Sequence, residues 1–144
     1  MVLSFTSMSG QLPAYATEGA SGLDLRAYLE EPMTLQPMER ALVPTGLKVA
    51  IPEGYEGQVR ARSGLAIKHG ISLVNAIGTI DSDYRGELMV PMINFGREPF
   101  TIENGDRIAQ LVIAAYERVT PELVPTLDDT ERGEGGFGHT GIKE

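Results

Sequence analysis

From residue 23 to about residue 117, the sequence is a succession of short apolar runs that are broken by Gly, Pro, Asn and Asp. Runs of this length between turn residues are typical of β-strands. The predicted strands cover residues 23–27, 41–43, 47–51, 57–62, 71–74, 86–95, 99–102 and 107–116, with turns at 44–46, 52–54, 83–86 and 103–106. With 17 Gly and 9 Pro in 144 residues, the pattern favours an all-β antiparallel sandwich or barrel over βαβ units.

Only one segment has a helical pattern. Residues 63–69 read Ser-Gly-Leu-Ala-Ile-Lys-His, and we expect Ser63 to cap this short helix and Gly70 to end it. Residues 125–144 differ from the rest in composition, because they are polar and Gly-rich with few large apolar side chains. The sequence therefore predicts one β domain over residues 1–124 and a C-terminal arm that is mobile without ligand.

Charge and composition exclude several classes of protein. The formal net charge is −8, from 20 acidic and 12 basic residues, which disfavours nucleic acid as a partner. Nine of the twelve basic residues are Arg, whose planar guanidinium suits two-point binding of phosphate. The chain has no cysteine, no signal-like start and no run of about 18 apolar residues. We therefore expect a cytoplasmic protein without disulfides or a membrane partner.

Several familiar motifs are missing or out of context. Residues 133–138 match G-x-G-x-x-G, but the few residues that follow show neither the helix nor the acidic residue that a dinucleotide-binding unit needs. His69 and His139 lie far apart in the sequence without further ligands at metal-binding spacing, which disfavours zinc. Neither is accompanied by a G-x-S-x-G segment, which disfavours a Ser-His-Asp hydrolase.

Two segments in the first half of the chain carry candidate ligands for an anion or a metal ion. Asp24 lies inside an apolar strand pattern, where a carboxylate is costly unless it is paired or bound to a cation; the alternative is an Asp that caps a turn. Arg62, Ser63 and Gly64 follow a predicted strand at the expected helix start, where a guanidinium, a hydroxyl and exposed N–H groups form an anion site. The alternative there is a plain N-cap beside a solvent-facing Arg.

The most specific segment covers residues 75–87, which read Asn-Ala-Ile-Gly-Thr-Ile-Asp-Ser-Asp-Tyr-Arg-Gly-Glu. Two strand-like runs flank a charged turn, so a β-hairpin is the plain structural interpretation. A hairpin accounts for Asp83 and Gly86. It does not account for the cluster of further polar, aromatic and glycine residues, which are Asn75, Gly78, Asp81, Tyr84 and Arg85.

The last two segments contain a half-buried amide and a Gly-rich arm. Gln110 falls on the apolar side of the alternation in residues 107–112 and needs partners there; the alternative is a Gln on an edge strand that reaches water. Residues 132–141 combine Arg132 with closely spaced glycines around Phe137. Such glycines let the backbone wrap a ligand, with Phe137 as a stacking surface and Arg132 as a phosphate ligand, whereas the alternative is a disordered linker.

In order, spacing and content, these five segments resemble the five signature motifs of the trimeric dUTPases. The match covers residues 20–141, and the segments 75–87 and 132–141 are the most specific. One departure is His139, where many members of the family have Ser. The resemblance implies a jelly-roll or distorted β-barrel subunit, assembled as a homotrimer with exchange of the C-terminal arms. Each active site would then combine a base-binding hairpin, phosphate motifs and an arm from three different subunits.

The resemblance also implies an activity, the hydrolysis of dUTP to dUMP and pyrophosphate with Mg²⁺, which limits uracil incorporation into DNA and supplies dUMP for dTMP synthesis. Asp81 would be the general base, Gln110 would lie close to the α-phosphate, and Asp24 would bind Mg²⁺ through water. Uracil would be read by Asn75 and the strand after it, under the ring of Phe137. The implied substrate-binding residues are Arg62, Ser63, Gly64, Asn75, Gly78, Thr79, Ile80, Tyr84, Arg132, Phe137, Gly138, His139 and Thr140.

Two other functions share this fold or these motifs. A dCTP deaminase, or a bifunctional deaminase–hydrolase, needs a catalytic Glu in the base pocket, and residues 75–80 contain none. A non-catalytic nucleotide-binding or structural jelly-roll protein would retain the arm and the phosphate motifs but lose the general base, whereas Asp81 is present. Arg85 and Glu87 are open to a structural interpretation, as partners within the turn or across a subunit interface.

Overall fold

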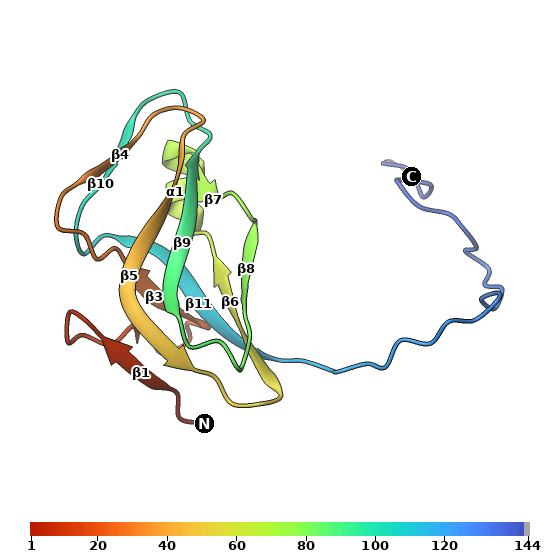
Figure 1. Cartoon of the computed structure of the whole chain (residues 1–144). Helices are drawn as coiled ribbons and strands as arrows, with labels where there is room; N and C mark the ends of the chain where they lie inside the picture. Colours follow the sequence, from red (N-terminus) through yellow and green to blue (C-terminus); the bar gives the residue numbers. More distant parts are fainter. Residues whose placement is uncertain (143–144) are drawn as a thin grey trace.

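Two antiparallel β-sheets make up most of the protein and pack against each other (Figure 1). The computed structural model describes residues 1–142. In chain order its elements are β1 (Ser4–Ser7), β2 (Ala14–Tyr15), β3 (Gly22–Arg26), β4 (Met33–Leu35), β5 (Arg40–Ala50), β6 (Tyr55–Arg60), α1 (Ser63–His69), β7 (Ile71–Leu73), β8 (Ile77–Ile80), β9 (Glu87–Asn94), β10 (Phe100–Ile102) and β11 (Arg107–Ala115). The prediction of an all-β architecture with one short helix is confirmed.

The two sheets are built from strands that are mostly distant in sequence. The four-stranded sheet has the order β1-β5-β9-β7, and the five-stranded sheet has the order β2-β3-β11-β6-β8. β10 and β4 form a separate two-stranded sheet at one end. Pairs such as β5 with β9 and β3 with β11 are antiparallel and join the early and late parts of the chain. Neighbouring strands of this sandwich are therefore joined mostly by long connections and not by a succession of hairpins.

The hydrophobic core lies between the two main sheets, because alternate residues of each strand point inward. β9 contributes Val90 and Met92, and β11 contributes Ala109 and Leu111, all of which are fully buried. Burying one large aliphatic side chain stabilises the fold by about 1.5–3 kcal/mol, so the paired sheets form a firm scaffold. The outer face of the five-stranded sheet is consequently available for polar residues.

The turn predicted at residues 44–46 is an irregularity inside one long strand. β5 runs without interruption past Pro44, and its pairing with β9 shifts register between Pro44 and Lys48. Gly46 has φ 67°, a conformation that favours glycine, and Thr45 donates a hydrogen bond from Oγ1 to the backbone oxygen of Leu88 at 2.7 Å. The turn-forming residues therefore bend the strand without ending it, as a β-bulge does.

The helix covers the predicted residues, but its start differs from the prediction. Arg62 is the N-cap residue and makes no side-chain capping bond, while Ser63 is the first helical residue. The prediction for the other end is confirmed, because Gly70 adopts the left-handed conformation at φ 70°. None of the helical residues is buried. Within residues 1–142, no helix is long and apolar enough to cross a lipid bilayer.

Three short strands have no sequence signal of their own. β1, β2 and β4 are between two and four residues long, and most of their residues are exposed or half-buried. They form because longer or later strands pair with them, β5 with β1, β3 with β2 and β10 with β4. Alternation over so few residues cannot be recognised in a sequence.

The chain after β11 leaves the two sheets and runs away from them (Figure 1). Residues 116–142 contain no helix or strand, and their side chains are exposed. This segment includes the arm that the sequence predicts. The division into a domain over residues 1–124 and an arm over residues 125–144 stays a prediction.

Candidate active site

A row of three polar side chains crosses the outer face of the five-stranded sheet. Gln110 on β11 lies directly opposite Asp24 on β3 and Arg60 on β6. Paired positions of antiparallel strands place their side chains on the same face, so these three side chains are neighbours. β11 is the central strand of the sheet, which rules out the alternative of a Gln on an edge strand.

A β-bulge decides which side of β11 faces the core. Arg107 pairs with Arg26, and Ala109 pairs with the residue before Arg26, so Ile108 is an extra residue without a partner on β3. Ile108 and Ala109 are both buried, and Gln110 lies on the opposite, outer side. Strict alternation would place Gln110 on the apolar side together with Ile108. That prediction is wrong because the bulge shifts the alternation by one residue.

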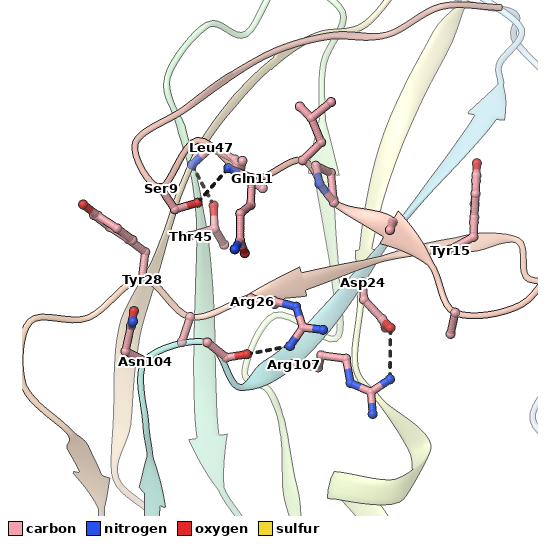
Figure 2. Close-up of a pocket in the computed structure, with 16 residues that line it drawn as sticks. Ser9, Gln11, Tyr15, Asp24, Arg26, Tyr28, Thr45, Leu47, Asn104 and Arg107 are labelled. Atoms are coloured by element: carbon pink, nitrogen blue, oxygen red, sulfur yellow. Dashed lines mark hydrogen bonds and ion pairs between the residues drawn. The ribbon is translucent and has the colours of Figure 1, made fainter.

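The Asp24 carboxylate is held by two guanidinium groups, one of which is visible in Figure 2. Its Oδ1 lies 3.7 Å from Nε of Arg62, and its Oδ2 accepts a hydrogen bond from Nη1 of Arg107 at 3.3 Å. The side chain is 15% exposed, so the carboxylate needs such compensation. The turn-capping alternative is wrong, since Asp24 lies within β3 and pairs with Ala14 on one side and Gln110 on the other.

Arg62 lies where β6 leads into α1, and its side chain turns back over the sheet. Its Nη1 donates a hydrogen bond to the backbone oxygen of Arg107 at 3.2 Å. Together with the ion pair to Asp24, this contact excludes the alternative of a solvent-facing Arg. Ser63 and Gly64 follow as exposed residues at the start of the helix, with open space beside Gly64. Asp24, Arg62 and Gln110 thus belong to one cluster at one end of the sheet.

The segment that begins at Asn75 does not form the predicted hairpin. β8 belongs to the five-stranded sheet and pairs with β6, whereas β9 belongs to the other sheet and pairs with β5 and β7. The turn over residues 81–86 therefore crosses between the sheets. The prediction is wrong because each run finds its partner far away in sequence. Among the described strands, only β6 neighbours β8, so β8 is an edge strand with an unpaired outer side.

Gly78 brings the Asn75 amide close to the backbone of this edge strand. A Cβ added to Gly78 would lie 3.5 Å from Nδ2 of Asn75 and 3.3 Å from Cβ of Val59. Without that atom, the face of the strand beside Asn75 stays open. Thr79 is exposed, while Ile80 is half-buried and packs against the core.

Hydrogen bonds fix the turn after β8. The backbone oxygen of Asp81 accepts from the N–H of Tyr84 at 3.1 Å, and the Tyr84 hydroxyl donates to the backbone oxygen of Glu87 at 2.9 Å. Arg85 donates through Nη1 to two backbone oxygens of the same turn, at 2.7 and 2.8 Å. The Glu87 carboxylate accepts the N–H of Gly46 at 2.8 Å. These contacts favour the structural interpretation of Arg85 and Glu87, whereas Asp81 is exposed.

The Asp81 turn and the cluster of Asp24, Arg62 and Gln110 lie at opposite ends of the five-stranded sheet. Ile77 pairs with Arg60, which lies in the same row as Gln110, and Asp81 comes four residues after Ile77. At about 3.3 Å per residue, Asp81 is roughly 13 Å farther along the strand, and β8 is about 10 Å from β11 across the sheet. The structure therefore does not bring Asp81 and Gln110 together within one chain.

The predicted ligands of the arm also lie apart from both groups (Figure 1). Arg132 donates from Nε to the backbone oxygen of Gly135 at 2.8 Å, within a local turn. The Phe137 side chain is fully exposed. The other predicted ligands in the arm are exposed as well, namely Gly138, His139 and Thr140.

A cavity of about 670 Å³ adjoins Asp24 (Figure 2). Its lining includes Arg26 and Arg107 together with residues of the N-terminal segment and the loop before β11. Arg26 donates to the backbone oxygen of Gly105 at 2.8 Å and makes no ion pair with Asp24. The described residues contain no group of three or more His, Cys, Asp or Glu side chains that could enclose a metal ion.

The chain is similar to known proteins over most of its length. A family model described as dUTPase matches residues 9–141. The chain belongs to the dUTPase family. A protein from Finegoldia magna named deoxyuridine 5'-triphosphate nucleotidohydrolase is 58% identical over 130 residues, which are 90% of this chain and 91% of that protein. Proteins of the same name from Fusobacterium nucleatum and Treponema denticola are each 60% identical over 131 residues, covering 91% of this chain and 90% and 91% of their own.

Solved structures of dUTPases have the same fold. The dUTPase of Staphylococcus bacteriophage 80alpha with dUpNHpp superposes with a TM-score of 0.88 at 28% identity, covering 98% of this chain and 99% of its own. Another structure of that phage enzyme gives a TM-score of 0.79 at 25% identity, covering 89% and 99%. The predicted family and fold class are confirmed. The roles of the individual residues stay predictions.

Two further residues, which were not predicted from the sequence, shape this dUTPase site. Arg107 belongs to a recognised segment, but its contact with Asp24 depends on the bulge, which leaves no local signal. Gly22 lies in the first segment, and an added Cβ there would collide with the side chain of Gln110. A glycine inside a predicted strand is the signal that indicates such a close approach.

Proposed function

We propose that this dUTPase hydrolyses dUTP to dUMP and pyrophosphate by in-line attack of water on the α-phosphorus, with Mg²⁺ as its cofactor. The observation that supports this best is the free outer side of β8, which leads directly to the exposed carboxylate of Asp81. An edge strand has unpaired backbone N–H and C=O groups, which can form hydrogen bonds with the donors and acceptors on the edge of a base. Family membership supplies the reaction, and these residues supply the site.

Uracil binds along β8. The backbone groups of Gly78 and Ile80 and the side-chain amide of Asn75 read its donors and acceptors, with Thr79 between them. Gly78 supports this role, because a Cβ there would be tight against Val59 and would occupy the open space beside the Asn75 amide. A site built from fixed polar groups rejects a base with misplaced donors, such as cytosine, by large factors. Close packing at C5 excludes thymine.

Asp81 is the general base. It holds the 3′-hydroxyl of the deoxyribose and takes a proton from the attacking water, which is typically worth about 10²–10⁴ in rate. Tyr84 packs on the sugar and leaves no room for a 2′-hydroxyl. Its hydrogen bond to the backbone oxygen of Glu87 supports this role, because it fixes the ring within the turn that follows β8.

The triphosphate binds at the other cluster. Arg62, Ser63 and Gly64 supply a guanidinium, a hydroxyl and backbone N–H groups, and Gln110 contacts the α-phosphate. The position of Gln110 on the central strand supports this role, since the strand is held on both sides and the amide is half-buried. Arg132 completes the phosphate site from the arm.

Mg²⁺ fits this site as an ion that the triphosphate itself carries. Asp24 offers one hard oxygen ligand group per chain, and no described cluster could enclose the ion. That donor set suits an ion that keeps part of its hydration shell, with Asp24 holding one of its water molecules. When bound, the ion neutralises charge on the phosphate oxygens.

A homotrimer completes the site. The roughly 16 Å between the backbones of Asp81 and Gln110, estimated from strand spacings, exceeds what a water and one phosphate group can bridge. We therefore assign Asp81 and Gln110 of one site to two different subunits, and the arm to the third. Phe137 stacks on uracil there, and Gly138, His139 and Thr140 close over the phosphates.

Pyrophosphate release from dUTP, dCTP, dTTP and UTP tests this function directly. We expect rapid release from dUTP and little from the other three. Deamination of dCTP would support the deaminase alternative, and tight binding without turnover would support the non-catalytic one. In the cell, the reaction would limit uracil incorporation into DNA and supply dUMP for dTMP synthesis, and we assign it to the cytoplasm.

A further inference from the structure

We propose that Arg107 is a positioning residue of this site: it orients Asp24 and Arg62, and it remains the partner of Asp24 when Arg62 turns to the triphosphate. This inference rests on the proposed function, because it takes Asp24 and Arg62 as ligands of the metal ion and the phosphates. In this proposal Arg107 itself contacts neither the metal ion nor the phosphates. It acts through its two neighbours.

Arg107 forms hydrogen bonds with both of them, and it uses different atoms for each. Its Nη1 donates to Oδ2 of Asp24 at 3.3 Å, and its backbone oxygen accepts from Nη1 of Arg62 at 3.2 Å. The direct contact between Arg62 and Asp24 is longer, at 3.7 Å. Arg107 is thus the closer partner of the carboxylate. Breaking the longer contact of Arg62 costs less interaction energy, so Arg62 is the guanidinium that can leave more easily.

The β-bulge at Ile108 explains why Arg107 can reach Asp24. Arg107 lies three positions before Gln110, an odd number, so regular alternation would point the two side chains to opposite faces and Arg107 toward the core. With Ile108 inserted, Arg107 returns to the outer face that carries Gln110 and Asp24. Bulges are frequent beside active sites because they redirect a side chain in this way.

The charges favour an exchange of partners on binding. One carboxylate and two guanidinium groups leave a net positive charge that attracts a polyphosphate. If Arg62 moved to a phosphate and Asp24 had no other cation, a carboxylate that is only 15% exposed would be left unpaired. Arg107 prevents this. Without Arg107, Asp24 would retain Arg62 and compete with the phosphates for it.

The test measures binding of the non-hydrolysable analogue dUpNHpp by calorimetry, first without metal and then with Mg²⁺. We expect Arg107→Gln to weaken metal-free binding by about tenfold relative to wild type. In an Asp24→Asn background the same substitution should change binding by less than about twofold, because no carboxylate remains to capture Arg62. Arg107→Lys, which keeps the charge, should restore most of the binding.

Arg40→Gln is the matched control, since it removes the same charge from β5 in the other sheet. Binding by Arg107→Gln equal to this control would overturn the proposal. An equal loss in the presence and absence of Asp24 would also overturn it and assign Arg107 a purely structural role. If Arg107→Gln does not fold, the same cycle with Arg107→Met, which removes the charge but keeps an unbranched side chain, and Asp24→Asn decides. Failure of the wild-type protein to bind the analogue would instead refute the proposed function.

Discussion

The side chain of Gln110 occupies the space that a side chain on Gly22 would need. Gly22 pairs with Val112 on β11, so it lies diagonally across from Gln110 on the same face. A Cβ on Gly22 would lie 3.1 Å from both Cβ and Cδ of Gln110 and closer still to its amide oxygen. The backbone of Gly22 does not need glycine for its conformation, because its φ is not positive. The glycine is therefore required for the space it leaves to the amide.

We predict that Gly22→Ala lowers kcat for dUTP by roughly tenfold to a hundredfold with little loss of stability. The added methyl group displaces the flexible end of Gln110, which the fold tolerates, but the amide then misses the α-phosphate. Gly19→Ala is the matched control, since nothing lies near that position. Steady-state kinetics and thermal unfolding of both variants provide the measurement. Equal kcat values for the two variants would show that Gly22 does not position Gln110.

The sequence predicted the fold class because strand-length apolar runs and turn residues are local signals. The prediction failed where the strand that pairs with a segment is distant in sequence. The runs around Asp81 read as a hairpin, yet β8 and β9 lie in different sheets. The Gly and Pro residues near Gly46 read as a turn, yet they bend a continuous strand. Neither outcome can be predicted from the few residues of the segment, because each depends on which distant strand pairs with it.

The site was predictable in its residue types but not in its geometry. Asp24 required compensation by a cation, and two guanidinium groups provide it. The face of Gln110 was predicted wrongly, because a single extra residue at Ile108 reverses the alternation that the prediction used. Arg107 had no assigned role for the same reason. Chemistry is readable from residue identity, whereas a register shift becomes visible only when two strands are paired.

Asp81→Asn should leave the fold and analogue binding nearly intact and lower kcat by roughly a hundredfold or more. The carboxylate of Asp81 is exposed at the end of β8 and is not among the residues that pack the core. An amide can keep a hydrogen bond to the sugar but cannot take the proton from water. Measuring kcat beside the Kd for dUpNHpp separates these roles. Turnover near the wild-type rate would remove Asp81 from the mechanism.

Mixing two inactive variants tests the shared site. Asp81→Asn and Gln110→Ala subunits, unfolded and refolded together, should regain activity at about a quarter of the sites, because each site then draws its two residues at random from different subunits. Each variant refolded alone is the control, and sedimentation should give a trimer for all samples. No recovery in mixed trimers would place Asp81 and Gln110 of one site in the same chain.

Deleting residues 132–144 should cost far more activity than stability. Arg132 and Phe137 are exposed in the free chain, so removing them forfeits almost no buried apolar surface, and Tm should change by less than about 2 °C. With ligand bound, the arm stacks Phe137 on uracil, brings Arg132 to the γ-phosphate and excludes water. These contacts strengthen as the site closes, so their loss should appear mainly in kcat.

Phe137→Ala should have an intermediate effect, because it removes the stacking surface but keeps the phosphate ligand of the arm. Limited proteolysis gives an independent measurement of closure. The Gly-rich segment around Gly135 is open to a protease in the free chain, and dUpNHpp with Mg²⁺ should protect it. The phosphate-site variant Arg62→Gln should bind the analogue poorly, so we expect it to lose that protection while keeping the same arm. Cleavage at one rate with and without the analogue, together with full activity of the truncated enzyme, would mean that the arm is only a linker.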